Sequence, residues 1–243
     1  ASRYSKSFVE RFAESFKLIL HEIMDVNELK DISYVSEDDI NLLDSYNRTE
    51  HELDYGDVLD AFNDHLAKHP DNSLVSCNDV SYSYGEGAFI ADKIAKRLAD
   101  FGVECGDCVG FLTERSELYM FSVLGIMSAG AVYVPLDDAL PDERIQFMLN
   151  DCEAKAVIVS DSTHGRIKNM VNDKIRLFNI SDIVDGETAT LSSLPAEYND
   201  LACILYTSGT TGIPKGVKIT RKSIVNVVAS YTDDYGLDGD DVY

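Results

Sequence analysis

The chain has 243 residues, 45% hydrophobic and 26% charged, so it is long enough to bury a substantial core. Its 43 acidic and 21 basic residues give a formal net charge of −22, a field that repels nucleic acid and anionic membrane surfaces. We therefore expect neither as a general partner; such acidity also keeps a protein soluble without any specific partner.

The first 56 residues do not have the pattern of a domain core. Residues 5–24 carry an apolar stripe with helical period, which predicts an amphipathic helix that needs a partner surface. The stripe consists of Phe8, Phe12, Phe16, Ile19 and Ile23. Residues 25–56 are polar and acid-rich, and Ser36 to Asp39 has the pattern of a capping box for a short helix through Leu43. We interpret this stretch as a linker that lies on another surface.

From Asp57 the pattern changes to alternating strands and helices. A helix from Val58 to Ala67 precedes a hairpin, whose strands 73–77 and 80–84 are joined at Asn78-Asp79. Further strands are expected at 109–112, 131–135, 156–160, 175–180, 202–206 and 217–220, and helices at 88–101, 114–128, 166–171, from Pro141 and from about Lys222. This alternation predicts an α/β fold of βαβ units with a largely parallel sheet.

The start of the sequence and the number of cysteines predict that the protein lies in the reducing cytoplasm. No basic segment followed by an apolar stretch opens the sequence, and the most apolar run, 123–136, is too short to span a bilayer. Five cysteines are an odd number and argue against a disulfide framework. Cys105 and Cys108 have metal or redox spacing, but no second pair follows at zinc-site spacing. We interpret them as ordinary cysteines of a turn.

The segment Tyr206–Gly216, "YTSGTTGIPKG", has the composition of a phosphate-binding loop. Gly and Thr residues between regular elements let backbone N–H groups and hydroxyls converge on phosphate oxygens, and Lys215 supplies a positive charge. The spacing matches neither a Walker A motif nor a dinucleotide fingerprint. Glycine and proline also mark ordinary turns, so composition alone leaves a simple chain reversal open.

The full string closely resembles the phosphate-binding signature of the adenylate-forming superfamily, which includes acyl-CoA ligases and the adenylation domains of nonribosomal peptide synthetases. The resemblance implies that a set of loop residues wraps the β- and γ-phosphates of ATP while Lys215 helps to hold them. The set is Thr207, Ser208, Gly209, Thr210, Thr211 and Gly212. Arg221 stands where the family often has histidine.

Two further stretches resemble adenylation-domain signatures, and the N-terminal part selects a branch of the superfamily. "VSYSYGE", in which Gly87 follows where leucine is usual, resembles the first signature, and residues 125–151 resemble the second. Residues 1–24 resemble the closing helix of a condensation domain, and residues 25–56 the condensation–adenylation linker. Residues 57–243 would then be the truncated N-terminal part of an adenylation domain.

By this resemblance the parent protein activates an amino acid with ATP and Mg²⁺ to an aminoacyl adenylate. A carrier-protein phosphopantetheine thiol then takes the acyl group, so the condensation and carrier domains are the expected partners. The residues for adenine, ribose and metal and the catalytic lysine are expected beyond Tyr243, so we predict that this fragment is inactive alone and contains no catalytic residue. Two alternatives stay open: a freestanding acyl- or aryl-acid ligase, and a non-catalytic docking module.

Overall fold

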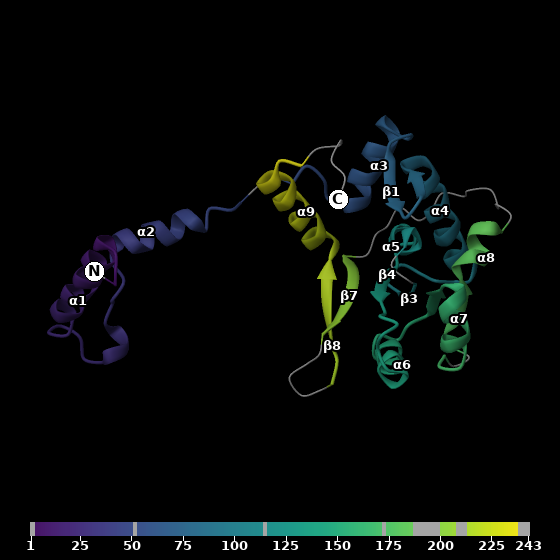
Figure 1. Ribbon diagram of the computed structural model, residues 1–243. Helices are drawn as coiled ribbons and strands as arrows, with labels where there is room; N and C mark the ends of the chain where they lie inside the picture. Colours follow the sequence, from purple (N-terminus) through teal and green to yellow (C-terminus); the bar gives the residue numbers. More distant parts are fainter. Residues whose placement is uncertain are drawn as a thin grey trace. The chain divides into compact units, whose positions relative to one another are not determined.

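The computed structural model describes residues 3–50, 53–113, 116–171, 174–186, 200–207 and 213–237 (Figure 1). The chain divides into two compact units, Ala1–Glu52 and Leu53–Tyr243, each of which is described on its own. No helix among the described residues is both long enough and apolar enough for a membrane span.

The first unit contains helices without a core of their own. Its elements are α1 (Lys6–Glu22), a 3₁₀ turn η1 (Leu29–Asp31) and α2 (Glu37–Tyr46). Ser5 caps α1 by accepting from the Phe8 N–H, and Ser36 caps α2 by accepting from the Asp39 N–H at 3.1 Å. The cap at Ser36 is as predicted, although the helix runs past Leu43. The described residues of α1 and α2 include no buried side chain, and the stripe side chain Phe12 is 66% exposed.

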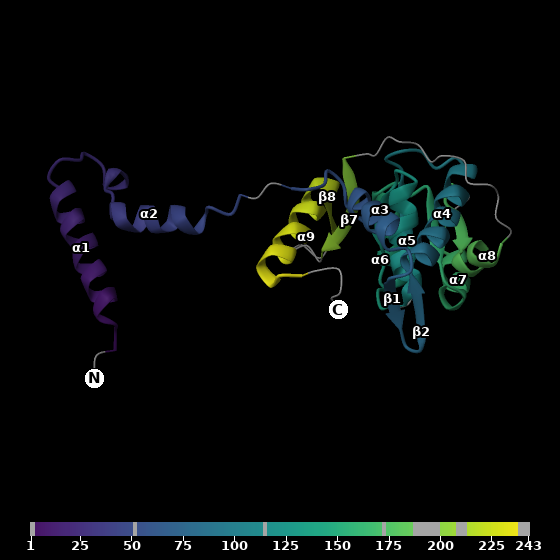
Figure 2. The same ribbon diagram turned by 90° about the horizontal axis from the view of Figure 1, so that it is seen from above.

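The second unit opens with a helix and a small antiparallel hairpin. Its elements are α3 (Val58–Lys68), β1 (Ser73–Cys77) and β2 (Val80–Ser83). The hairpin turns at Asn78, which has φ 55°, as the predicted Asn-Asp turn requires. Figure 2 shows the two strands as neighbouring blue arrows.

A six-stranded sheet forms the body of the second unit. The strand order is β6-β5-β3-β4-β7-β8, parallel except for the antiparallel pair β7 and β8. The strands are β3 (Cys108–Leu112), β4 (Val132–Pro135), β5 (Ala156–Val159), β6 (Arg176–Asn179), β7 (Leu201–Thr207) and β8 (Lys215–Thr220). The helices are α4 (Tyr84–Asp100), α5 (Glu117–Ser128), α6 (Asp142–Asp151), α7 (Asp161–Lys168), α8 (Ile180–Asp185) and α9 (Arg221–Tyr235). The predicted α/β class with a largely parallel sheet is confirmed.

Helices pack on both faces of this sheet. One face, with Phe111 of β3 and Ile158 of β5, packs against α4, α5 and α8. The other face, with Leu112 and Val157, packs against α6 and α7. Because β3 and β5 are covered on both sides, residues Val109 to Leu112 and Ala156 to Val159 are all buried. This explains why the sequence shows continuous apolar runs there.

Three sequence predictions differ from the structure near element ends. The strand predicted over 156–160 stops at Val159, because Ser160 caps α7 in a reciprocal pair with Thr163. Helix α7 therefore begins at Asp161 rather than at Arg166. The strand predicted over 175–180 ends at Asn179, whose side chain accepts from the Ser181 N–H at 3.2 Å and opens the unpredicted helix α8. Six residues are too few for helical periodicity to show.

Two further boundaries shift in the same way. Helix α4 begins at Tyr84, four residues before the predicted start, because Ser83 and Glu86 form a capping box. Ser83 N–H donates to Glu86 Oε2 at 2.8 Å, and Glu86 N–H donates to Ser83 Oγ at 3.2 Å. Strand β8 begins at Lys215 rather than at Val217, so Lys215 and Gly216 belong to a strand and not to the loop.

Candidate phosphate-binding site

The hairpin of β7 and β8 carries the glycine- and threonine-rich segment. Thr207 ends β7 and lies directly across from Lys215, which begins β8. The Thr207 Oγ1 hydroxyl donates to the Lys215 carbonyl at 3.5 Å. Both side chains are exposed. Thr207 and Lys215 are thus brought together at the two ends of the loop, whereas Ser208, Gly209, Thr210, Thr211 and Gly212 lie outside the described residues.

Gly216 allows the hairpin to pack closely at its base. A Cβ at this position would lie 2.8 Å from Ile204 Cγ2 and 3.2 Å from the ring of Tyr206, its partner across the strand pair. The Tyr206 hydroxyl donates to Asp151 Oδ2 at 2.7 Å, so it anchors the hairpin to the end of α6. Burial and the Asp151 bond both raise the pKa of Tyr206, which keeps its proton in place as a donor.

Successive side chains of a strand point to opposite faces. Tyr206, which anchors the hairpin to α6, therefore lies on a different face from the candidate phosphate-binding residues Thr207 and Lys215. Tyr206 and Gly216 share the face that packs toward α6. Thr207 and Lys215 are the next pair along and therefore project from the opposite face. The anchoring contacts fix the strand ends without using either candidate phosphate-binding side chain.

The segment around the hairpin has the opposite charge to the chain as a whole. Residues 201–232 contain no aspartate or glutamate and four cations, Lys215, Lys218, Arg221 and Lys222, in a chain with 43 acidic residues. Lys215, Lys218 and Lys222 are exposed. These three exposed lysines favour an anion locally although the protein as a whole repels one. Sequence reasoning did not use this signal, although the sequence contains it.

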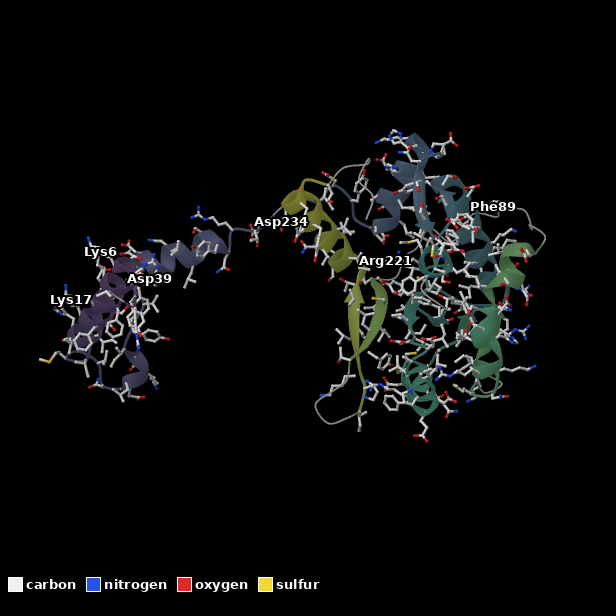
Figure 3. The ribbon with its side chains drawn as sticks, in the orientation of Figure 1. Lys6, Lys17, Asp39, Phe89, Arg221 and Asp234 are labelled. Atoms are coloured by element: carbon white, nitrogen blue, oxygen red, sulfur yellow. The ribbon has the colours of Figure 1, made fainter. Side chains whose placement is uncertain are left out.

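Arg221 has a structural position rather than a ligand-facing one. It begins α9 directly after β8 (Figure 3), is 4% exposed, and donates from its NH1 group to Asp57 Oδ2 at 3.0 Å. Its NH2 group donates to the Met127 carbonyl at 2.8 Å. Arg221 therefore forms a buried ion pair that holds α9 to the start of α3 and the end of α5.

A cavity lies at the carboxyl ends of β3 and β4. This cavity has a volume of about 820 Å³ and is bordered by Thr113, Tyr119, Asp137 and Asp138 together with β1 residues. The connections that follow β3 and β4 cover opposite faces of the sheet, an arrangement at which α/β proteins bind ligands. Its described lining includes two aspartates and no cation, which does not suit a phosphate. The hairpin is the better phosphate candidate.

Metal ligands are not gathered in the described part of the chain. Within those residues no group of three or more His, Cys, Asp or Glu side chains could hold a metal ion.

The sheet and its helices define a doubly wound α/β protein, and comparison with known proteins defines its family. The model of the AMP-binding enzyme family matches residues 62–243, so the chain belongs to the AMP-binding enzyme family.

Curated relatives match almost the whole chain. One component of linear gramicidin synthase from Brevibacillus parabrevis is 32% identical over 98% of this chain and 3% of its own length. Surfactin synthase subunit 2 of Bacillus subtilis (strain 168) is 31% identical over 93% of this chain and 6% of its own length. The chain thus spans a small part of the relatives that it matches.

Solved structures have the same fold. The AMPPNP-bound form of the nonribosomal peptide synthetase FmoA3 superposes with a TM-score of 0.81 at 22% identity, over 98% of this chain and 26% of that one. The four-domain synthetase holo-AB3403, bound to AMP and glycine, has a TM-score of 0.77 at 25% identity over 96% and 17%. VinN has a TM-score of 0.68 at 21% identity over 78% and 52%.

Proposed function

We propose that the chain is part of a nonribosomal peptide synthetase module that activates an amino acid with ATP to an aminoacyl adenylate. The observation that carries the proposal is the hairpin of β7 and β8 within a chain of the AMP-binding enzyme family. Thr207 and Lys215 flank the loop, and the surrounding segment is positively charged in an acidic protein. These features suit the leaving pyrophosphate end of ATP.

The N-terminal unit supports a synthetase over a freestanding ligase. The family match begins at residue 62, yet the linear gramicidin synthase component is similar over 98% of the chain and therefore also over most of the first 61 residues. The synthetase FmoA3 covers 98% of the chain in structure, whereas VinN covers 78%. We assign residues 1–24 to the end of a condensation domain, 25–56 to the linker and 57–243 to the adenylation domain.

The exposed apolar stripe of α1 supports the assignment of residues 1–24 to the end of a condensation domain. The stripe side chains Phe8, Phe12 and Phe16 are 52%, 66% and 54% exposed, and an apolar helix face of this kind is normally buried against a neighbouring surface. A condensation domain preceding the chain would supply that surface.

In this mechanism the described residues bind and orient the nucleotide. The Lys215 ammonium neutralises charge on the β- and γ-phosphates, and the Thr207 hydroxyl turns from the Lys215 carbonyl to donate its one hydrogen bond to a phosphate oxygen. Backbone N–H groups and hydroxyls of Ser208 to Gly212 would complete the donor set. Holding the phosphates in place leaves the α-phosphorus open to the amino-acid carboxylate.

Two further groups belong to the reaction but not to the described residues. Mg²⁺ would neutralise phosphate charge, with ligands from elsewhere in the parent, and the phosphopantetheine thiol of a carrier domain would take the acyl group. The partners are thus amino acid, ATP and the condensation and carrier domains. All five cysteines are described and none forms a disulfide, which supports a cytoplasmic location.

Amino-acid-dependent exchange of pyrophosphate into ATP tests the proposal. We expect exchange with at least one amino acid when the chain is extended to its complete adenylation domain, and none from the 243 residues alone. Exchange by the 243 residues alone would refute the fragment assignment. A complete domain that accepts acyl or aryl acids but no amino acid would identify a ligase instead, and one with no exchange at all would identify a docking module.

A further inference from the structure

Two arginines from distant parts of the sequence lie over the same phenylalanine ring. Arg97 lies in the last turn of α4, and Arg176 begins β6. The Cζ atom of Arg97 is 5.7 Å from the centre of the Phe178 ring, and the Cζ atom of Arg176 is 5.9 Å from it. Both arginines are exposed, whereas Phe178 is buried in the core. A fixed core residue thus positions two guanidinium groups at the surface.

A second aromatic ring completes this group of side chains. Phe101 is the C-cap of α4, one turn after Arg97, and its ring meets the Phe178 ring edge-on with the centroids 5.7 Å apart. The Cζ atom of Arg176 is also 5.6 Å from the centre of the Phe101 ring. Arg176 and Phe178 are two residues apart in β6 and therefore share one face of the strand. We call Arg97, Phe101, Arg176 and Phe178 the arginine cluster.

Neither arginine of the cluster is neutralised by an acidic side chain of the structure. Within the described ranges, no hydrogen bond or ion pair joins the guanidinium group of Arg97 or Arg176 to another residue. Asp100, three residues after Arg97 on α4, pairs instead with Lys96 at 3.1 Å. Two like charges are thus held near each other without a counter-charge, although the chain has 43 acidic residues. An anion from solution would relieve their repulsion.

The chemistry of the cluster selects a phosphate group. Stacking on an aromatic ring uses the flat face of a guanidinium group, and the N–H groups at its edge stay available to bond an oxyanion. A phosphate monoester carries a charge of about −1.5 to −2 at pH 7 and three acceptor oxygens, which suits two guanidinium groups. A carboxylate carries one charge and two oxygens. Phe101 is 44% exposed and offers apolar surface to the organic part of an ester.

We propose that the arginine cluster binds the phosphate group of a small phosphate monoester, with Arg97 and Arg176 donating hydrogen bonds to its oxygens. Phe178 holds the two guanidinium groups in place, and Phe101 contacts the body of the ester. The site is distinct from the hairpin of β7 and β8, because β6 and β8 are the two opposite edge strands of the six-stranded sheet. The inference does not depend on the proposed adenylation activity.

The test is a titration of the full chain with phenyl phosphate at pH 7 and constant ionic strength, followed by ¹H–¹⁵N NMR spectra. We expect saturable shifts of the Nε–H signals of Arg97 and Arg176, which are assigned by their loss in Arg97→Gln and Arg176→Gln. Each of these substitutions should raise the Kd about tenfold through the loss of a charge-assisted bond. Benzoate, which has the same ring but a singly charged carboxylate, should bind more weakly, and so should inorganic phosphate, which lacks the ring.

Lys96→Gln is the matched control, because it removes an equal charge from the neighbouring residue of α4 and leaves the cluster intact. It should leave the Kd unchanged, whereas Arg97→Lys, which keeps the charge but loses the planar donor group, should weaken binding. Lys215→Ala should not alter the shifts at the cluster, so a failure of this site and a failure of the proposed nucleotide site can be told apart. Circular dichroism of each variant checks that the fold is retained.

Four results would overturn the inference or one of its parts. Absence of saturable shifts at Arg97 and Arg176 would remove the site, and an equal loss of affinity in Lys96→Gln and Arg97→Gln would reduce it to general surface charge. Benzoate binding as tightly as phenyl phosphate would overturn the selection of phosphate. Inorganic phosphate binding as tightly as phenyl phosphate would overturn the contact between Phe101 and the body of the ester.

Discussion

Arg221 and Asp57 form a buried ion pair with an NH1–Oδ2 distance of 3.0 Å and side-chain exposures of 4% and 8%. Asp57 also caps α3, since its Oδ1 accepts from the Leu59 N–H at 2.8 Å. Arg221 in turn donates to the Met127 carbonyl near the end of α5. The pair therefore joins three helices, one of which, α9, directly follows the hairpin of β7 and β8.

Removing either partner of this pair should destabilise the second unit strongly. Arg221→Met leaves the Asp57 carboxylate buried without its countercharge, a change that costs about 3–5 kcal/mol in free energy of unfolding. Urea denaturation of the purified chain measures it. The double variant Asp57→Asn with Arg221→Met should lose less than the sum of the two single variants, because it leaves no buried charge unpaired.

Lys68→Ala supplies the control for an exposed pair. Lys68 Nζ lies 2.7 Å from Asp64 Oδ2, but the two side chains are 62% and 37% exposed. Water screens such pairs, so no change in unfolding free energy beyond error is expected. If Arg221→Met had an equally small effect, the buried pair would not be what holds α9 in place.

The sheet was predictable from the sequence because its strands are covered on both faces. Val109 to Leu112 and Ala156 to Val159 are short apolar runs between helices, and the structure buries them almost completely. Helix α8 was missed because its six residues carry too little periodicity, and it depends on the Asn179 cap. The local hydrophobic pattern thus predicts strands and helices that are extensively buried. It does not predict an element whose start depends on a single capping side chain, such as Asn179.

The candidate site likewise has one part that the sequence predicts and one part that it does not. The string of Thr and Gly residues with Lys215 could be recognised because it is contiguous. The contacts that hold it could not, since Arg221 and Asp57 are 164 residues apart and Tyr206 and Asp151 are 55 apart.

Gly216 should not tolerate a side chain. Gly216→Val would place its Cβ 2.8 Å from Ile204 Cγ2 and 3.2 Å from the Tyr206 ring, so the hairpin base must move. Overpacking of this kind costs about 1–3 kcal/mol in free energy of unfolding, measured by urea denaturation. We expect the Tyr206 hydroxyl to lose its bond to Asp151 at the same time, visible as a fall in the raised phenol pKa by ultraviolet titration.

Gly165→Ala is the control for the loss of a glycine. No atom lies within 4 Å of a Cβ built at this position in α7. Alanine in a helix interior is more favourable than glycine, so the variant should gain about 0.5–1 kcal/mol. A neutral Gly216→Val beside a stabilised Gly165→Ala would show that the hairpin base adapts without strain.

The ionisation of Cys108 should be visible in its alkylation rate. Only the thiolate reacts with iodoacetamide, so a lowered pKa moves the rise in the alkylation rate of Cys108 to lower pH than for an unstructured reference peptide that carries one cysteine. The Cys152 hydrogen bond and Lys218 lower this pKa, whereas burial, Asp107 and Glu153 oppose them. Quantitative mass spectrometry of the alkylated peptides across pH measures both curves.

Cys152→Ala removes the largest cause of the lowered Cys108 pKa. It should therefore move the curve of Cys108 alkylation rate against pH back to higher pH. Lys218→Met should move it in the same direction by a smaller amount. Cys105→Ala removes a nearby thiol that is not among the causes of the lowered Cys108 pKa, so it should leave the curve in place. An unchanged curve in Cys152→Ala would mean that the two thiols do not share the hydrogen bond.

Lys215 should contribute to nucleotide binding through its charge and its position in the hairpin. In the complete adenylation domain, Lys215→Ala removes one charge-assisted bond to phosphate, worth about 1.5–3 kcal/mol. This corresponds to a rise of about ten- to a hundredfold in the KM for ATP, measured by pyrophosphate exchange. Lys222→Ala removes an equal charge from the exposed surface of α9 and should change the KM little. Equal effects of both substitutions would assign the contribution to the general field of this segment, and no effect of Lys215→Ala would remove the residue from the site.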